Sequence, residues 1–160
     1  MPMFALPSAA GGVLDLRERL GRGPLVVVFF RGHWCPYCRR YLAKLQKHLH
    51  RYVALGAEVV GVSPEGPEVS RRLSGELGLG FPVVSDEGGR VIDAYGVRNT
   101  FSSVRTLLPH PAVFITDATG RLLFKSVDRN YKKRTTMRTL VGVLEAHVGR
   151  VAPVQDEVTD

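Results

Sequence analysis

The chain has 160 residues, of which 44% are hydrophobic and 23% charged, and its formal net charge is +7 at pH 7. This length and composition are those of one globular domain and exclude a disordered or fibrous protein. The longest unbroken apolar run, Leu25–Phe30, is far shorter than the roughly 20 residues that span a bilayer, so we expect no contact with a membrane.

The first predicted elements alternate between strand and helix. Leu25–Phe30 is apolar at every position, as in a strand that is buried on both faces. A helical pattern follows from Pro36 and ends at Gly56. Its apolar face is formed by Leu42, Leu45, Leu49 and Val53. A second strand is expected over Glu58–Val62.

The middle of the chain predicts shorter elements. A second helix is expected over Glu68–Leu77, and Gly78 ends it. The run Phe81–Val84 contains a proline, which indicates a strand end or an edge strand. Val91–Tyr95 has the pattern of a helical turn, and residues 96–110 form an irregular connection.

A β-hairpin and a helix close the domain. Ala112–Thr116 and Arg121–Ser126 flank a turn over Asp117–Gly120. The last helix carries an apolar stripe formed by Met137, Leu140, Val141, Leu144 and Val148. We therefore expect an α/β fold whose mixed central sheet is parallel in its first half, antiparallel in its second, and covered by helices on both faces. It forms a single domain over residues 1–150, followed by a flexible polar tail over residues 151–160.

Basic residues are concentrated around the cysteines. Between Arg19 and Ala57 there are six arginines and two lysines but no acid. Such a stretch is either a solvated helix face or a positive field that stabilises a thiolate and attracts an anionic partner, and the two are compatible. Lys132–Arg134 is another basic run, which we interpret as a solvated loop rather than a site for an anion or nucleic acid. We expect no nucleic-acid partner.

The two cysteines carry the strongest chemical signal. Cys35 and Cys38 lie three residues apart, directly after a predicted buried strand and at the start of a helix. A helix N-terminus stabilises a thiolate, and Pro36 suits the first helical position. Two residues three apart in the first turn of a helix have Cα atoms about 5 Å apart, a separation that permits a disulfide. We expect Cys35, the more exposed, to be the attacking thiolate and Cys38 to be the resolving thiol.

Two other interpretations of the pair are inert buried cysteines and half of a zinc site. A zinc site would need His33, His48 or His50 as further ligands, and the last two lie more than two helical turns from Cys38. We therefore expect no metal and no cofactor besides the redox-active cysteine pair. Two cysteines are too few for a secreted disulfide scaffold, and the N-terminal residues do not resemble a signal peptide, so we expect a cytoplasmic protein.

Three segments carry a resemblance to a known family: Arg31-Gly-His-Trp-Cys-Pro-Tyr-Cys38, Asp93-Ala-Tyr-Gly-Val97 and Pro111-Ala-Val-Phe-Ile-Thr-Asp-Ala-Thr-Gly120. Together they resemble the peroxiredoxin-like branch of the alkyl hydroperoxide reductase/thiol-specific antioxidant group. The resemblance implies a thioredoxin fold from about Leu6 to Val148. Asp128, Tyr131 and Arg134 also look like recurrent features of this branch, without an assigned role.

The sequence departs from typical peroxiredoxins at three positions. Their Thr or Ser three residues before the peroxidatic cysteine is Gly32 here, their Pro seven before it is Val28, and their catalytic Arg falls at Pro111. The usual groups that polarise a peroxide are therefore absent from their usual places. Arg31 and His33 are the candidate substitutes.

Other positions are compared with thioredoxins. Pro111 matches their cis-proline, so we expect a cis bond there and pairing of the His110 backbone with an extended substrate. The buried Asp of thioredoxins falls at Phe29, which leaves water or His33 as proton acceptors for Cys38. Trp34 is expected to pack beside the thiols and shield them.

We interpret the chain as a thiol–disulfide oxidoreductase that cycles Cys35 and Cys38 between dithiol and disulfide. The alternative is a thiol-dependent peroxidase that reduces hydrogen peroxide or alkyl hydroperoxides through a sulfenic acid on Cys35. The expected partners are a disulfide-bearing protein or a peroxide as substrate, and a thioredoxin- or glutathione-type thiol as electron donor.

Overall fold

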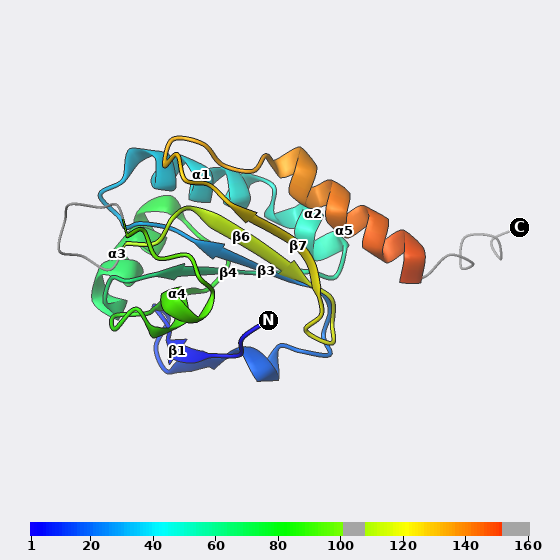
Figure 1. Ribbon diagram of the computed structural model, residues 1–160, viewed down its shortest axis with the longest axis horizontal. Coiled ribbons are helices and arrows are strands. Elements are labelled where there is room, and N and C mark those ends of the chain that lie inside the picture. Colours follow the sequence, from blue (N-terminus) through cyan, green and yellow to red (C-terminus); the bar gives the residue numbers. More distant parts are fainter. Residues whose placement is uncertain (101–107, 152–160) are drawn as a thin grey trace, which may run out of the picture.

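The computed structural model describes residues 1–100 and 108–151. Its centre is a five-stranded sheet in the order β5–β4–β3–β6–β7 (Figure 1). The strands are β3 (Leu25–Phe29), β4 (Glu58–Ser63), β5 (Val83–Ser85), β6 (Ala112–Thr116) and β7 (Leu122–Val127). β3, β4 and β5 are parallel, whereas β6 is antiparallel to β3 and β7 to β6. The predicted mixed sheet is confirmed, with β5 at one edge.

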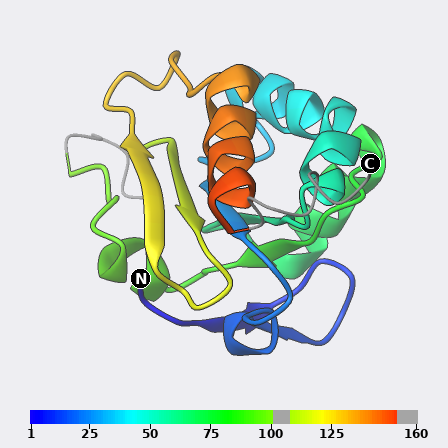
Figure 2. The ribbon, with the colours of Figure 1, turned by 90° about the vertical axis from the view of Figure 1, so that its right-hand side faces the viewer.

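Layers cover both faces of the sheet (Figure 2). One face is covered by α1 (Pro36–Lys47), α2 (Leu49–Ala54), α3 (Pro67–Leu77) and α5 (Met137–Val151). The other face is covered by α4 (Arg90–Ala94), by the hairpin of β1 (Ala5–Pro7) and β2 (Val13–Asp15), and by a 3-10 turn over Leu16–Glu18. This hairpin was not predicted from the sequence, and its turn contains two glycines with positive φ, Gly11 and Gly12.

The central strand β3 is buried at every position, as predicted. Val26 and Val28 face the layer of α1 and α5, whereas Val27 and Phe29 face the layer of α4. Alternating side chains of one strand thus contribute to two cores, which explains the unbroken apolar run in the sequence.

The predicted helix from Pro36 to Gly56 is two helices. The first ends at His48, whose ring Nδ1 lies 2.9 Å from the carbonyl oxygen of Lys44. The break rotates the second helix, so Tyr52 is fully buried and Val53 is 62% exposed. Placing Val53 on the apolar face was wrong, because the i to i+4 spacing identifies one face only along an unbroken helix.

Two expectations fall wholly or partly outside the described residues. They are the irregular connection over residues 96–110, which includes residues 101–107, and the polar tail, of which only residue 151 is described. In the parts of the chain that the structure describes, no helix combines the length and apolarity needed to cross a membrane.

The strand pairing brings several loops to one edge of the sheet. Phe29 at the carboxyl end of β3 pairs with Val62 of β4 and with Ala112 at the start of β6. Ala112 in turn pairs with Val127 at the end of β7. The loops after β3, β4 and β7 and the segment before β6 therefore lie at the same edge, where α1 begins.

Candidate active site

The cysteine pair occupies the first turn of α1. Cys35 caps the helix, and its sulfur accepts a hydrogen bond from the backbone N–H of Cys38 at 3.3 Å. Pro36 is in the first turn, where its missing N–H leaves no donor unpaired. The predicted location of the pair at a helix start is confirmed, and this location stabilises negative charge on the Cys35 sulfur.

Both cysteines are free thiols and both are buried. Cys35 is 1% exposed and Cys38 is 0% exposed. Cys35 is the more exposed of the two, as expected, but only by a narrow margin, because its side chain turns inward to cap the helix.

The two thiols have opposite pKa shifts. The pKa of Cys35 is lowered to about 5, chiefly because its sulfur accepts a hydrogen bond from the Cys38 thiol. The Cys38 N–H and the charges of Arg134 and Arg31 act in the same direction, against the cost of burial. The pKa of Cys38 is raised well above its usual range, because its thiol donates to Cys35 and because it is buried. At neutral pH the pair is therefore one thiolate and one thiol.

Arg134 reaches the pair from the connection between β7 and α5. Its Nη2 lies 3.3 Å from the sulfur of Cys38, and its Nη1 donates to the carbonyl oxygens of Tyr131 and Lys133. The hydroxyl of Tyr41 in α1 donates to the carbonyl of Thr135, the residue that follows Arg134, at 2.7 Å. The interpretation of this segment as a solvated loop holds for exposed Lys133 and is wrong for Arg134. The resemblance had singled out Arg134, but no local pattern indicated its contact.

Arg31 lies between two aromatic rings. Its guanidinium carbon is 5.0 Å from the centroid of Trp34 and 4.8 Å from that of Tyr131. Its Nε is buried and has no hydrogen-bond partner in the described chain. Trp34 is 49% exposed, so it stacks on Arg31 rather than filling the core. The stack keeps a positive charge near Cys35 while limiting its contact with water.

His33 contacts an acidic residue, Glu65, that was not predicted from the sequence. Glu65, in the loop after β4, accepts the backbone N–H of His33 at 2.7 Å and contacts its ring Nδ1. A Cβ at Gly32 would lie 2.5 Å from the indole nitrogen of Trp34 and 3.1 Å from the carboxyl carbon of Glu65. The position that carries Thr or Ser in typical peroxiredoxins is therefore already filled by neighbouring side chains.

Pro111 lies immediately before β6, buried, at the same edge of the sheet. None of the peptide bonds in the described residues is cis, so the expected cis bond at Pro111 was wrong. The trans form is intrinsically preferred even before proline, and here the Pro111 carbonyl accepts the N–H of Asp128 at 2.8 Å in continuation of the β6–β7 ladder. The N–H of His110 is donated to the carbonyl of Val97 at 2.7 Å, so it is not free for the predicted pairing with a substrate.

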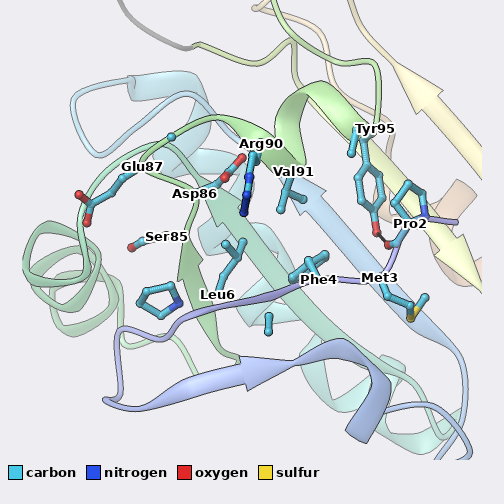
Figure 3. A pocket seen from close by; sticks show the side chains of 14 residues that line it. Pro2, Met3, Phe4, Leu6, Ser85, Asp86, Glu87, Arg90, Val91 and Tyr95 are labelled. Carbon is cyan, nitrogen blue, oxygen red and sulfur yellow. Dashed lines mark hydrogen bonds between the residues drawn. The ribbon is translucent and has the colours of Figure 1, made fainter.

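A separate cavity of about 590 Å³ lies between the N-terminal segment and α4 and contains neither cysteine (Figure 3). The Tyr95 hydroxyl closes one side by donating to the carbonyl of Pro2 at 2.6 Å. Among the described side chains, no group of three or more His, Cys, Asp or Glu residues is arranged to hold a metal ion.

The fold and the dithiol together define a thioredoxin-fold protein with its Cys-x-x-Cys motif at a helix N-terminus. Solved structures agree with this class. Peroxidoxin BcpB of Mycobacterium tuberculosis superposes with a TM-score of 0.80 at 20% identity, over 91% of this chain and 94% of that one. AhpC of Enterococcus faecalis superposes with a TM-score of 0.82 at 16% identity, over 96% of this chain and 93% of that one. The predicted thioredoxin-like fold is confirmed.

Residues 1–125 match the family model described as the AhpC/TSA family, and the chain belongs to that family. Thiol-disulfide oxidoreductase ResA of Halalkalibacterium halodurans is 38% identical over 96 residues, which are 59% of this chain and 53% of that relative. A putative peroxiredoxin of Mycobacterium tuberculosis is 33% identical over 95 residues, which are 59% of this chain and 60% of that relative. The matched region is thus little more than half the length of these two relatives.

The names of these relatives describe two kinds of oxidoreductase. Both reactions predicted from the sequence, disulfide exchange and peroxide reduction, fit the family.

Proposed function

We propose that this protein is a thiol–disulfide oxidoreductase whose Cys35 and Cys38 cycle between dithiol and disulfide. The observation that carries the proposal is that the two sulfurs of one helical turn are held in different protonation states. One sulfur is held as a thiolate by the hydrogen bonds from Cys38, and the other is held as a thiol beside Arg134. Such a pair has a thiolate that attacks the substrate first and a thiol that attacks the mixed disulfide in the second step.

In the first step the Cys35 thiolate attacks one sulfur of a substrate disulfide. The substrate S–S bond breaks, its other sulfur leaves as a thiolate that takes a proton, and Cys35 remains in a mixed disulfide. This step removes the negative charge and the hydrogen-bond acceptor that together raise the pKa of Cys38. Arg134 stays in place and favours the Cys38 thiolate.

In the second step Cys38 loses its proton to water, and its thiolate attacks the sulfur of Cys35. The mixed disulfide breaks, the second substrate thiol is released, and a Cys35–Cys38 disulfide forms. The substrate has gained two electrons, and the protein has lost two. An external thiol must return them. We propose a thioredoxin- or glutathione-type donor and a reducing compartment, the cytoplasm, because the cycle stops without continued reduction.

The test is to trap the intermediate. The Cys38→Ser variant, mixed with a disulfide-bearing protein such as insulin, is expected to accumulate a mixed disulfide through Cys35. The Cys35→Ser variant is the matched control and is expected to form none. A wild-type protein that does not reduce insulin in the presence of a thiol donor, together with a Cys38→Ser variant that traps nothing, would overturn the proposal.

A thiol-dependent peroxidase is the second candidate, and the charges around Cys35 favour it. Arg31 and Arg134 both stabilise a negative sulfur there, and a relative over part of the chain is named a putative peroxiredoxin. Against it, no side chain can be added at Gly32 without moving its neighbours. The rate at which reduced protein loses thiol to hydrogen peroxide, compared with Cys35→Ser, decides between them. A rate far above that of free cysteine would favour the peroxidase.

A further inference from the structure

A groove of about 500 Å³ lies beside the cysteine turn, between α1 and the connection from β7 to α5. Two tyrosines form part of its wall, and the remaining lining residues are all charged. These are Arg40, Lys44, Lys132, Lys133, Arg134 and Asp128. Five cations therefore face one carboxylate in a volume that is typical of a small-molecule site.

The cations of this groove form no salt bridges, as is also true of most other basic residues in the described part of the chain. Elsewhere Arg19 pairs with Glu58, Arg39 with Glu76 and Arg98 with Asp93, to take three examples. None of the five groove cations forms a salt bridge within the described residues. Apart from Arg134, whose charge already acts on the cysteine sulfurs, their positive potential is available to an anion from outside.

The groove is continuous with the redox site. Arg134 belongs to both, because it lines the groove and lies 3.3 Å from the sulfur of Cys38. Tyr37, which stands between the two cysteines in sequence, packs edge-on against Tyr131 with ring centroids 5.7 Å apart. The guanidinium of Arg40 lies over the ring of Tyr37 at 5.0 Å. An anion held by Arg40 and the lysines would therefore lie next to the cysteine turn.

We propose that this groove binds a small thiol that carries carboxylates, and that such a thiol is the electron donor of the Cys35–Cys38 cycle. The size of the groove favours a small molecule, its charge favours carboxylates, and its contact with the cysteine turn favours a thiol. Asp128 offers a partner for one ammonium group, so an amino-acid-derived thiol with more carboxylates than amines fits the lining. The role as donor rests on the proposed function, whereas the binding itself does not.

The donor reaction is balanced with two donor thiols. The thiolate of the first attacks the sulfur of Cys35, the Cys35–Cys38 bond breaks, and Cys38 leaves as a thiolate beside Arg134 and takes a proton. A second donor thiolate then attacks the donor sulfur of the mixed disulfide, which releases Cys35. Two donor thiols lose two electrons and form one donor disulfide, and the protein disulfide gains those electrons.

The experiment compares three thiols as reductants of the oxidised protein: glutathione, which carries two carboxylates and one amine, neutral 2-mercaptoethanol and cationic cysteamine. The change in fluorescence of Trp34, the only tryptophan of the chain, follows the reaction. The test variant is the double substitution Lys132→Gln/Lys133→Gln at two exposed positions. The control variant, Lys47→Gln/Arg138→Gln, removes the same charge from exposed positions outside the groove lining.

We expect the test variant to be reduced about fivefold more slowly by glutathione, the size of effect that two exposed charge contacts supply, and at an unchanged rate by 2-mercaptoethanol. Reduction by cysteamine is expected to be unchanged or faster. The control variant is expected to behave as the wild type. Equal slowing with all three thiols, or an equal loss in the control variant, would overturn the assignment of the groove.

Binding of S-methylglutathione, which has no free thiol, separates the groove from the redox cycle. Saturable binding to the reduced wild type that is weakened in the test variant and kept in the control supports the site even if the protein proves not to exchange disulfides. Absence of binding up to about 10 mM, which corresponds to roughly −3 kcal/mol, overturns it. Equal displacement by inorganic phosphate at the same concentration would also overturn it, because it would show a site for any anion.

Discussion

The guanidinium Nη2 of Arg134 lies 3.3 Å from the sulfur of Cys38, although 96 residues separate them in the chain. Thioredoxins place an acid near the second cysteine, whereas this site places a permanently charged cation there. A guanidinium cannot accept the Cys38 proton, but it stabilises the thiolate once the proton has left. In the proposed cycle Arg134 therefore stabilises the Cys38 thiolate that attacks the mixed disulfide.

Replacing Arg134 by Gln is expected to raise the pKa of Cys35 and to slow the attack of Cys38 on the mixed disulfide. The reason is that its charge lowers the pKa of both thiols. The rate of mixed-disulfide resolution measured by rapid quench checks this. Arg134→Lys is expected to restore part of the rate, and Lys47→Gln, at an exposed position outside the groove lining, is the control. Resolution at the wild-type rate in Arg134→Gln would contradict the assignment.

The alkylation of Cys35 by iodoacetamide is expected to have its pH midpoint at about 5, far below that of an ordinary thiol. In Cys38→Ala the midpoint is expected to rise, because the hydrogen bond from the Cys38 thiol is the largest contribution to the lowered pKa of Cys35. Mass spectrometry of the alkylated protein gives the profile. A midpoint near 8.5 in the wild type would show that Cys35 is not activated.

The stability of the reduced protein is expected to depend on pH through Cys35. Its pKa is lowered from 9.0 to about 5 on folding, so the stability it contributes is complete above pH 9 and is lost as the pH falls through about 5. The pKa of Cys38 is raised on folding, so Cys38 contributes the opposite slope, which begins only near pH 9, where unfolded Cys38 loses its proton and folded Cys38 keeps it.

The free energy of unfolding of the reduced wild type, relative to Cys35→Ser, is therefore expected to increase from about pH 5.5 to about pH 8.5, by at most about 1.4 kcal/mol per pH unit. Denaturant titrations of both proteins under reducing conditions measure the difference. The oxidised wild type has no thiol to titrate and serves as a second control. A difference that does not change with pH would refute the lowered pKa.

Adding a side chain at Gly32 is expected to displace Trp34. A Cβ there would lie 2.5 Å from the indole nitrogen of Trp34, which is half exposed and free to swing outward. We expect Gly32→Ala to cost about 1 kcal/mol of stability and to shift the Trp34 fluorescence to that of a fully exposed indole. In Gly32→Ala/Trp34→Ala most of that cost is expected to disappear. Unchanged fluorescence in the single variant would contradict this packing.

The elements of the fold could be predicted from the sequence because their signals are local. The unbroken apolar run of Leu25–Phe29 indicates a strand buried on both faces, and the turn over Asp117–Gly120 indicates a hairpin. The break at His48 was missed, since a helix of the expected period is compatible with the residues on both sides of it. The position of Cys35 at the N-terminus of α1 also followed from neighbouring residues alone.

What the tertiary structure decided is the surroundings of the two sulfurs. Arg134, Tyr131 and Glu65 come from loops that follow other strands, and only the pairing of β3 with β4 and of β6 with its two neighbours brings these loops to the start of α1. The sequence within 30 residues of Cys38 contains no pattern that indicates its contact with Arg134. The position of the cysteine pair was therefore predictable from the sequence, because it is encoded in one helical turn. The charges that tune its chemistry were not, because they act through space between residues far apart in the chain.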